Sequence, residues 1–268
     1  MKKRRFSPRA FLTALLICIG LAACYTVPQT GRKAFNVVSP ETEIKLGLKS
    51  FEEIKHLEHI SSNAVQIAAI KRVGEQIAAV ANPDIPNAKW EFVLFESKEP
   101  NAFALPGGKV GVYTGILPIT MNDGGLAAVI GHEVAHVAAR HGAERISEQM
   151  AMAGLATGLA IGLSGEDSRT RNLALLGFGV ATTVGAVLPH SRLQEREADR
   201  IGLTYMAKAG YDPKEAVAFW QRFMEYNRKQ GGRPPAFLST HPTDESRIAS
   251  LQSLLPEAEV YYQTSGRR

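Results

Sequence analysis

The residues with the clearest potential for chemistry are two histidines four positions apart in an apolar stretch, His132 and His136, with Glu133 between them. Residues four apart lie on one face of an α-helix, so both imidazoles can bind the same zinc ion. Glu133 points about 100° away from His132 around the helix, so it can take a proton from water without binding the metal. Burying these polar groups among apolar neighbours without a metal would be costly. The pattern predicts a zinc hydrolase with Glu133 as general base.

A catalytic zinc site usually has three protein ligands and one open position, so a further ligand is required. Of the two cysteines, Cys18 lies in a predicted N-terminal export signal and Cys24 is predicted to carry a lipid, which leaves His, Asp or Glu. The best candidates are Glu195 and Asp199, four apart in a second helical segment at residues 191–202. Glu195 is predicted to bind the metal. Asp199 is predicted to accept the N–H of a ligand histidine and fix its tautomer.

Neighbouring residues refine this prediction. Ala198 and Gly202 share the face of the predicted ligand, and their small size would let the two helices approach closely. Glu197 lies about 200° away around the helix and is predicted to be structural. His141 follows His136 by five residues, so we expect it to turn away from the ligand face and to lie at the surface or at a helix end.

Three separated motifs together resemble the HtpX/BepA/LoiP-type zinc metallopeptidases of metallopeptidase family 48. The motifs are His132-Glu133-Val134-Ala135-His136, then Ser191-Arg192 with Glu195 and Ala198-Asp199, then Ser239-Thr240-His241-Pro242 with Arg247. The similarity covers residues 35–255 and implies a gluzincin fold with one zinc ion per chain. It also implies that the glutamate of an E-x-x-A-D pattern, here Glu195, is the third ligand. The chain looks most like the short lipoprotein members of the family.

His241 follows a polar loop at residues 229–235 and precedes Pro242, which favours an extended backbone, so we expect it at the edge of a loop. In the family, a histidine at this place lies near the metal, which implies two competing catalytic roles. It could donate a hydrogen bond to the oxyanion of the tetrahedral intermediate. Alternatively it could occupy the open metal position as a latch, which we favour because an unregulated peptidase would be hazardous. A surface histidine beside a turn is the third interpretation.

The predicted function is a zinc-dependent endopeptidase of the bacterial cell envelope that degrades misfolded or misassembled envelope proteins. In this mechanism the zinc ion polarises the scissile carbonyl, and Glu133 passes a proton from water to the leaving amine. One alternative is a non-catalytic, chaperone-like assembly factor for outer-membrane proteins, working with the assembly machinery; a scaffold would not need Glu133. Another is a zinc hydrolase for a non-peptide bond such as a cell-wall amide. The strand at Ala102, Phe103 and Ala104 favours a peptide, because an extended substrate can pair with an exposed strand edge.

The first 23 residues, with a basic start, an apolar stretch and small residues at the end, predict a secretory signal peptide. Leu21-Ala22-Ala23-Cys24 resembles the lipobox of bacterial lipoproteins, which implies that Cys24 carries the lipid that attaches the protein to a membrane. An ordinary signal peptide is the alternative. Tyr25, where an aspartate would be the usual inner-membrane retention signal, favours the outer membrane over the inner membrane, facing the periplasm.

The charge balance depends on this leader. The chain has 31 Lys and Arg and 26 Asp and Glu, and removal of the leader takes five of the basic residues and none of the acidic ones, leaving 26 of each. The basic character of the precursor therefore belongs to the export signal. General electrostatic attraction to nucleic acid loses its support, and no nucleic-acid partner is predicted.

The elements that must position these residues predict a single domain at residues 41–258, between a lipid-anchored tether at 24–40 and a C-terminal tail at 259–268. Apolar periodicity predicts early helices, and β-branched or alternating residues predict a few short strands before residue 114. From Gly124 onward the pattern is helical. The expected fold class is α+β: a mostly helical, zincin-like metallopeptidase domain with a small β-sheet.

Two apolar runs rich in glycine and alanine, residues 150–163 and 173–188, flank a polar link. Each is shorter than the ~20 residues of a comfortable membrane span. We expect a helical hairpin buried through its small residues in preference to one that contacts the membrane.

Overall fold

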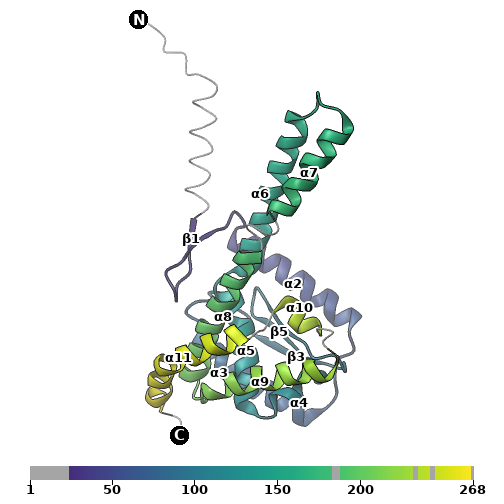
Figure 1. Ribbon diagram of the computed structural model, residues 1–268. Helices are drawn as coiled ribbons and strands as arrows, with labels where there is room; N and C mark the ends of the chain where they lie inside the picture. Colours follow the sequence, from purple (N-terminus) through teal and green to yellow (C-terminus); the bar gives the residue numbers. More distant parts are fainter. Residues whose placement is uncertain (1–23, 183–187, 232–234, 242–244, 267–268) are drawn as a thin grey trace, which may run out of the picture.

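The computed structural model describes residues 24–182, 188–231, 235–241 and 245–266, so the predicted signal peptide lies outside the described residues. The fold is α+β and mostly helical with small β-sheets, as predicted (Figure 1). Its helices are α2 (Pro40–Leu57), α3 (Ala64–Ala81), α4 (Leu117–Thr120), α5 (Asp123–Ala138), α6 (His141–Gly162), α7 (Ser168–Thr182), α8 (Leu188–Lys208), α9 (Lys214–Lys229), α10 (Ala236–Thr240) and α11 (Glu245–Thr264).

The main sheet has the strand order β3 (Glu91–Phe95), β5 (Lys109–Tyr113), β4 (Ala102–Leu105). Strands β3 and β5 are parallel, whereas β4 runs antiparallel to β5 and forms one edge of the sheet. Gly107 and Gly108 make the turn between β4 and β5 with φ angles of 91° and 81°, a backbone conformation that glycine adopts without a steric penalty. The turn returns the chain to the sheet and leaves β4 at its edge.

Helix α5 lies at the centre of the fold and is buried along almost its whole length. It packs against α3, α8 and α9, which explains why its sequence is apolar on every side. Asn122 caps its N-terminus by accepting a hydrogen bond from the Gly125 amide. The predicted close approach of the two helices is present: a Cβ atom added to Gly202 of α8 would lie 2.8 Å from the backbone nitrogen of His132.

The expectation of a buried hairpin at residues 150–188 is wrong for the described residues. Helices α6 and α7 project away from the rest of the molecule (Figure 1), and Leu155, Ile161, Leu173 and Val180 are each at least 60% exposed. Only the first two turns of α6 are buried, because beyond them α7 is the element that α6 packs against. No helix in the described ranges is long and apolar enough to cross a membrane.

The segment expected to be a tether packs against the domain. Strands β1 (Cys24–Thr26) and β2 (Lys33–Phe35) pair antiparallel, and Val27, between them, is buried in the hydrophobic core. We call residues 24–38 the strap. At the other end, α11 continues to Thr264, beyond the expected boundary at residue 258.

Candidate metal centre and active site

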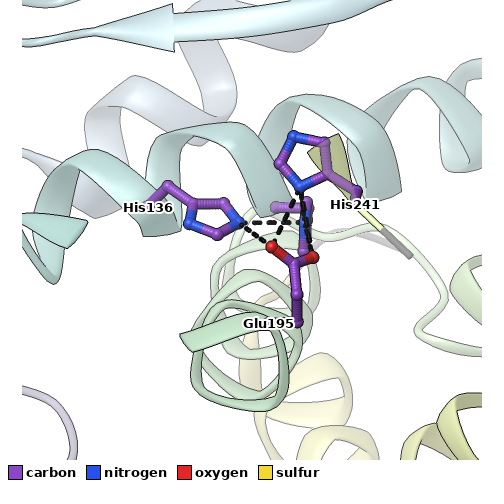
Figure 2. Close-up of side chains that lie close together, drawn as sticks. His136, Glu195 and His241 are labelled. Carbon is purple, nitrogen blue, oxygen red and sulfur yellow. Dashed lines mark hydrogen bonds and ion pairs between the residues drawn. The ribbon is translucent and has the colours of Figure 1, made fainter. Parts of the chain in front are cut away.

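The structure brings the three predicted metal ligands together. His132 and His136 project from α5, and Glu195 projects from α8. The Nε2 atoms of the two histidines are 3.2 Å apart, and each lies 3.3 Å from one oxygen of Glu195. His241, at the end of α10, adds a fourth donor with its Nδ1 atom 3.1 Å from Glu195 Oε2. Figure 2 shows His136, Glu195 and His241 pointing toward one another.

These four side chains fit a metal ion. One ligand atom from each lies within 4.8 Å of the others, and all four residues are buried. Imidazole nitrogens with one carboxylate oxygen form a donor set that suits zinc. Burial lowers the pKa of His136, which favours the neutral imidazole that a metal requires. Burial opposes ionisation of Glu195, but the neighbouring imidazoles outweigh it and hold its pKa well below the usual range.

Glu133 lies beside this cluster and faces the cleft. Its Oε1 atom is buried without a hydrogen-bond partner in the described part of the chain, although His241 Nε2 lies 3.4 Å away. Burial raises the pKa of the Glu133 carboxyl above its ordinary value. A carboxylate with a raised pKa is better matched to accepting and returning a proton near neutral pH.

Asp199 and Arg247 lie behind His132. Asp199 Oδ1 is 3.1 Å from His132 Nδ1, and Arg247 donates two hydrogen bonds to the same carboxylate, at 2.7 and 2.8 Å. The Arg247 guanidinium also sits 3.6 Å from the centre of the Trp220 ring. Burial alone would lower the pKa of His132, but hydrogen bonds to Asp199 and Glu195 outweigh it and raise that pKa to about 9. Residue spacing does not predict the contact between Arg247 and Asp199, because α11 and α8 are distant along the chain.

His241 is buried, not a surface histidine beside a turn, so that third interpretation is wrong. The residue follows α10, and its backbone N–H donates to the Phe237 carbonyl oxygen. Its Nδ1 atom lies 3.2 Å from His132 Nε2, within the ligand cluster. Its other ring nitrogen faces Glu133. Pro242 lies outside the described residues.

A cleft of about 300 Å³ opens over the cluster. Its walls include Ala102, Phe103 and Ala104 of the edge strand β4, together with Glu133 and His241. The strand expected to pair with a substrate is thus in the same cleft as the candidate general base.

Two residues that sequence reasoning set aside are part of the site. His141 is fully buried, and its Nδ1 atom lies 2.8 Å from His136 Nδ1. Glu197 is buried as well, with Oε2 3.0 Å from His141 Nε2. The expectation that His141 turns away assumed one continuous helix. Instead, Arg140 adopts a left-handed conformation with φ of 57°, between the end of α5 and the start of α6. The change in chain direction brings the His141 side chain back to the last turn of α5, where His136 lies.

Comparison with known proteins identifies relatives of this chain. The model of the family described as Peptidase family M48 matches residues 64–255. The chain is 38% identical to the mitochondrial metalloendopeptidase OMA1 of Schizosaccharomyces pombe, over 89% of this chain and 68% of that protein. It is 34% identical to the mitochondrial metalloendopeptidase OMA1 of Bos taurus, over 85% of this chain and 44% of the relative. It is 29% identical to the beta-barrel assembly-enhancing protease of Escherichia coli K12, over 85% of this chain and 47% of that protein.

Proposed function

The chain belongs to peptidase family M48 and is a metalloendopeptidase, and on that basis we propose that it is a zinc endopeptidase of the bacterial cell envelope that degrades misfolded or misassembled envelope proteins. The observation that carries the chemistry is the convergence of His132, His136 and Glu195 beside the buried Glu133, whose Oε1 has no hydrogen-bond partner among the described residues. The quality-control role is supported by the resemblance to an Escherichia coli protease named for beta-barrel assembly.

The residues of the site divide the work of hydrolysis. His132, His136 and Glu195 would hold the zinc ion, which when bound supplies Lewis acidity toward the scissile carbonyl and lowers the pKa of the attacking water. Glu133 accepts the proton of that water and delivers it to the leaving amine. Asp199 accepts the Nδ1–H of His132, which fixes the tautomer that leaves Nε2 free for the metal.

The proposed substrate is an extended polypeptide. Strand β4 pairs with β5 on one side, and its other edge borders the cleft. A substrate strand that hydrogen-bonds to Ala102, Phe103 and Ala104 would be held by its main chain, largely independently of its side chains. Such binding suits unfolded or misassembled proteins, whose backbone is accessible.

We assign His241 the role of a latch. Its Nδ1 atom lies among the ligand atoms, where it would take the coordination position that water and substrate need. A latch predicts that purified His241→Ala cleaves faster than the wild type, including cleavage of itself. An oxyanion donor predicts the opposite, a loss of about 100-fold or more. Unchanged activity with full zinc content would dismiss both roles.

The proposed location is the outer membrane, on the periplasmic side, with attachment through a lipid on Cys24. Cys24 is exposed, so its thiol is accessible for modification. We also propose outer-membrane assembly machinery as a partner, a proposal supported by the similarity to an Escherichia coli protease named for beta-barrel assembly.

The test of this function compares casein cleavage by the wild type and Glu133→Gln at equal measured zinc content. Loss of a general base should lower the rate by about 10²- to 10⁴-fold while zinc and fold are kept. Undiminished cleavage by Glu133→Gln would remove the mechanism. Absence of cleavage by the zinc-loaded wild type would instead support the alternative of a non-catalytic assembly factor.

A further inference from the structure

The strap reaches into the interior beside the metal centre. Arg32 Nε donates a hydrogen bond of 2.7 Å to Glu197 Oε2, and the Thr30 hydroxyl donates to the other oxygen of the same carboxylate. The remaining guanidinium nitrogens of Arg32 form a bidentate pair with Glu144 of α6, at 2.7 and 2.8 Å. Gln194 of α8 donates to Glu144 as well. Both carboxylates are almost fully buried, so Arg32 compensates two charges that would be costly alone.

A second set of contacts continues from Glu197 to a metal ligand. Glu197 Oε2 lies 3.0 Å from His141 Nε2, and His141 Nδ1 lies 2.8 Å from His136 Nδ1. A metal on His136 Nε2 leaves the proton of that ring on Nδ1. His141 Nδ1 must then accept this proton's hydrogen bond, which places the proton of His141 on Nε2. That N–H faces the Glu197 carboxylate, which is an acceptor, so one assignment of tautomers satisfies every contact.

The charge states agree with this assignment. Burial lowers the pKa of His141, which favours the neutral ring. Burial opposes ionisation of Glu197, but hydrogen bonds from His141, Thr30 and Arg32 outweigh it and lower its pKa. When Glu197 accepts the Nε2–H of His141, the other ring nitrogen of His141, Nδ1, becomes a better acceptor for the N–H of His136. Such partners of metal ligands commonly tune metal affinity.

We propose that Thr30 and Arg32 of the strap are positioning residues for the metal ligand His136, acting through Glu197 and His141. The inference rests on the proposed zinc site and adds to it a part of the chain whose composition predicts only a tether. The strap begins at Cys24, so the segment that would carry the lipid also helps to hold the metal ligand in its orientation.

The test measures zinc affinity of the full chain by competition with a chromophoric chelator, without reference to cleavage. Arg32→Gln and Glu197→Gln should each weaken zinc binding by about 10- to 100-fold, the usual effect of losing a partner behind a metal ligand. The matched control is Lys33→Gln, which removes an exposed charge from the adjacent position of the strap. That variant should bind zinc as the wild type does.

A double variant separates positioning from general support of the fold. If Arg32 acts through Glu197, then Arg32→Gln combined with Glu197→Gln binds zinc no more weakly than Glu197→Gln alone. Additive losses would overturn the proposal, as would wild-type affinity in a folded Arg32→Gln. The visible absorption spectrum of the Co²⁺-loaded protein should also change in Arg32→Gln, although Arg32 is not itself a candidate ligand.

Circular dichroism of each variant shows whether it has folded. If Arg32→Gln does not fold, the proposal is tested with Thr30→Val, which removes one hydroxyl and nearly keeps the shape of the side chain. The proposal expects Thr30→Val to bind zinc more weakly than the wild type, and unchanged binding contradicts it. Failure of the wild type to bind zinc would instead refute the proposed zinc site. Wild-type zinc binding with equal affinity in all variants would refute the strap's role alone.

Discussion

Gly202→Ala tests whether the close contact of α5 and α8 sets the geometry of the metal site. A Cβ atom at Gly202 would lie 2.8 Å from the backbone nitrogen of His132 and 2.9 Å from the carbonyl carbon of Gly131. Ordinary contacts of a Cβ atom begin at 3.4 Å. Both neighbours are backbone atoms in a buried helix, so no side chain can move aside. The helices must separate by about 0.6 Å, the difference between these distances.

Such a shift matters more for the metal than for the fold. Overpacking typically costs about 1–3 kcal/mol, whereas alanine is favoured over glycine in a helix by about 1 kcal/mol. The net loss of about 2 kcal/mol or less should leave the protein folded, since small domains have about 5–15 kcal/mol of stability. Metal–ligand distances tolerate about 0.2 Å. Because Glu195 is on α8 and both histidines are on α5, separation of the helices should weaken zinc binding by about 10- to 100-fold.

The assay is chelator competition for zinc, together with chemical denaturation of the metal-free protein. Gly154→Ala is the matched control: this glycine lies in the exposed part of α6, and an added Cβ would have no neighbour within 4 Å. The control should gain about 0.5–1 kcal/mol of stability and keep its zinc affinity. Wild-type zinc affinity in Gly202→Ala would refute the idea that this contact fixes the ligands.

Three further perturbations have defined outcomes. Because the pKa of His132 is raised to about 9 in the metal-free protein, zinc binding must displace a proton from this ring below that pH. Calorimetry in buffers of different ionisation enthalpy should find about one proton released on zinc binding at pH 7 and none from this group well above pH 9. Equal proton release at both pH values would contradict this expectation. Asp199→Asn should weaken zinc binding by about 10- to 100-fold in chelator competition, because the His132 tautomer is no longer fixed by a carboxylate. Unchanged affinity would show that Asp199 pairs with Arg247 without affecting the metal ligand. Cys24→Ser should move the protein from the membrane to the soluble fraction, as followed by immunoblot; retention on the membrane would point to the exposed hairpin of α6 and α7 as the attachment.

The parts of the site that follow from helical periodicity could be predicted. The spacing of His132 and His136 depends only on local geometry, and the structure has both on one face of α5. The role of Gly202 in close helix packing could be predicted, because a small residue on the same helix face as the predicted ligand Glu195 lets another helix approach. The strands of the main sheet could be found for a similar reason, since alternation and β-branched residues are local signals, whereas the strands β1 and β2 of the strap were not predicted.

The parts that depend on a single backbone angle or on distant packing could not be predicted. The left-handed Arg140 changes the direction of the chain and brings His141 to His136, yet arginine is not a residue type that favours this conformation. The strap depends on Arg32 meeting Glu144 and Glu197, which are more than 100 residues away along the chain. The apolar residues of α6 and α7 indicated a hairpin, but composition alone does not distinguish burial in the domain from exposure.

The most direct test of the zinc centre is anomalous X-ray diffraction from crystals of the zinc-loaded protein, recorded above and below the zinc absorption edge. The proposed site predicts one strong anomalous peak per chain, at bonding distance from His132 Nε2, His136 Nε2 and a carboxylate oxygen of Glu195. A peak bound elsewhere, or no peak at this site in a crystal that contains stoichiometric zinc, would contradict it.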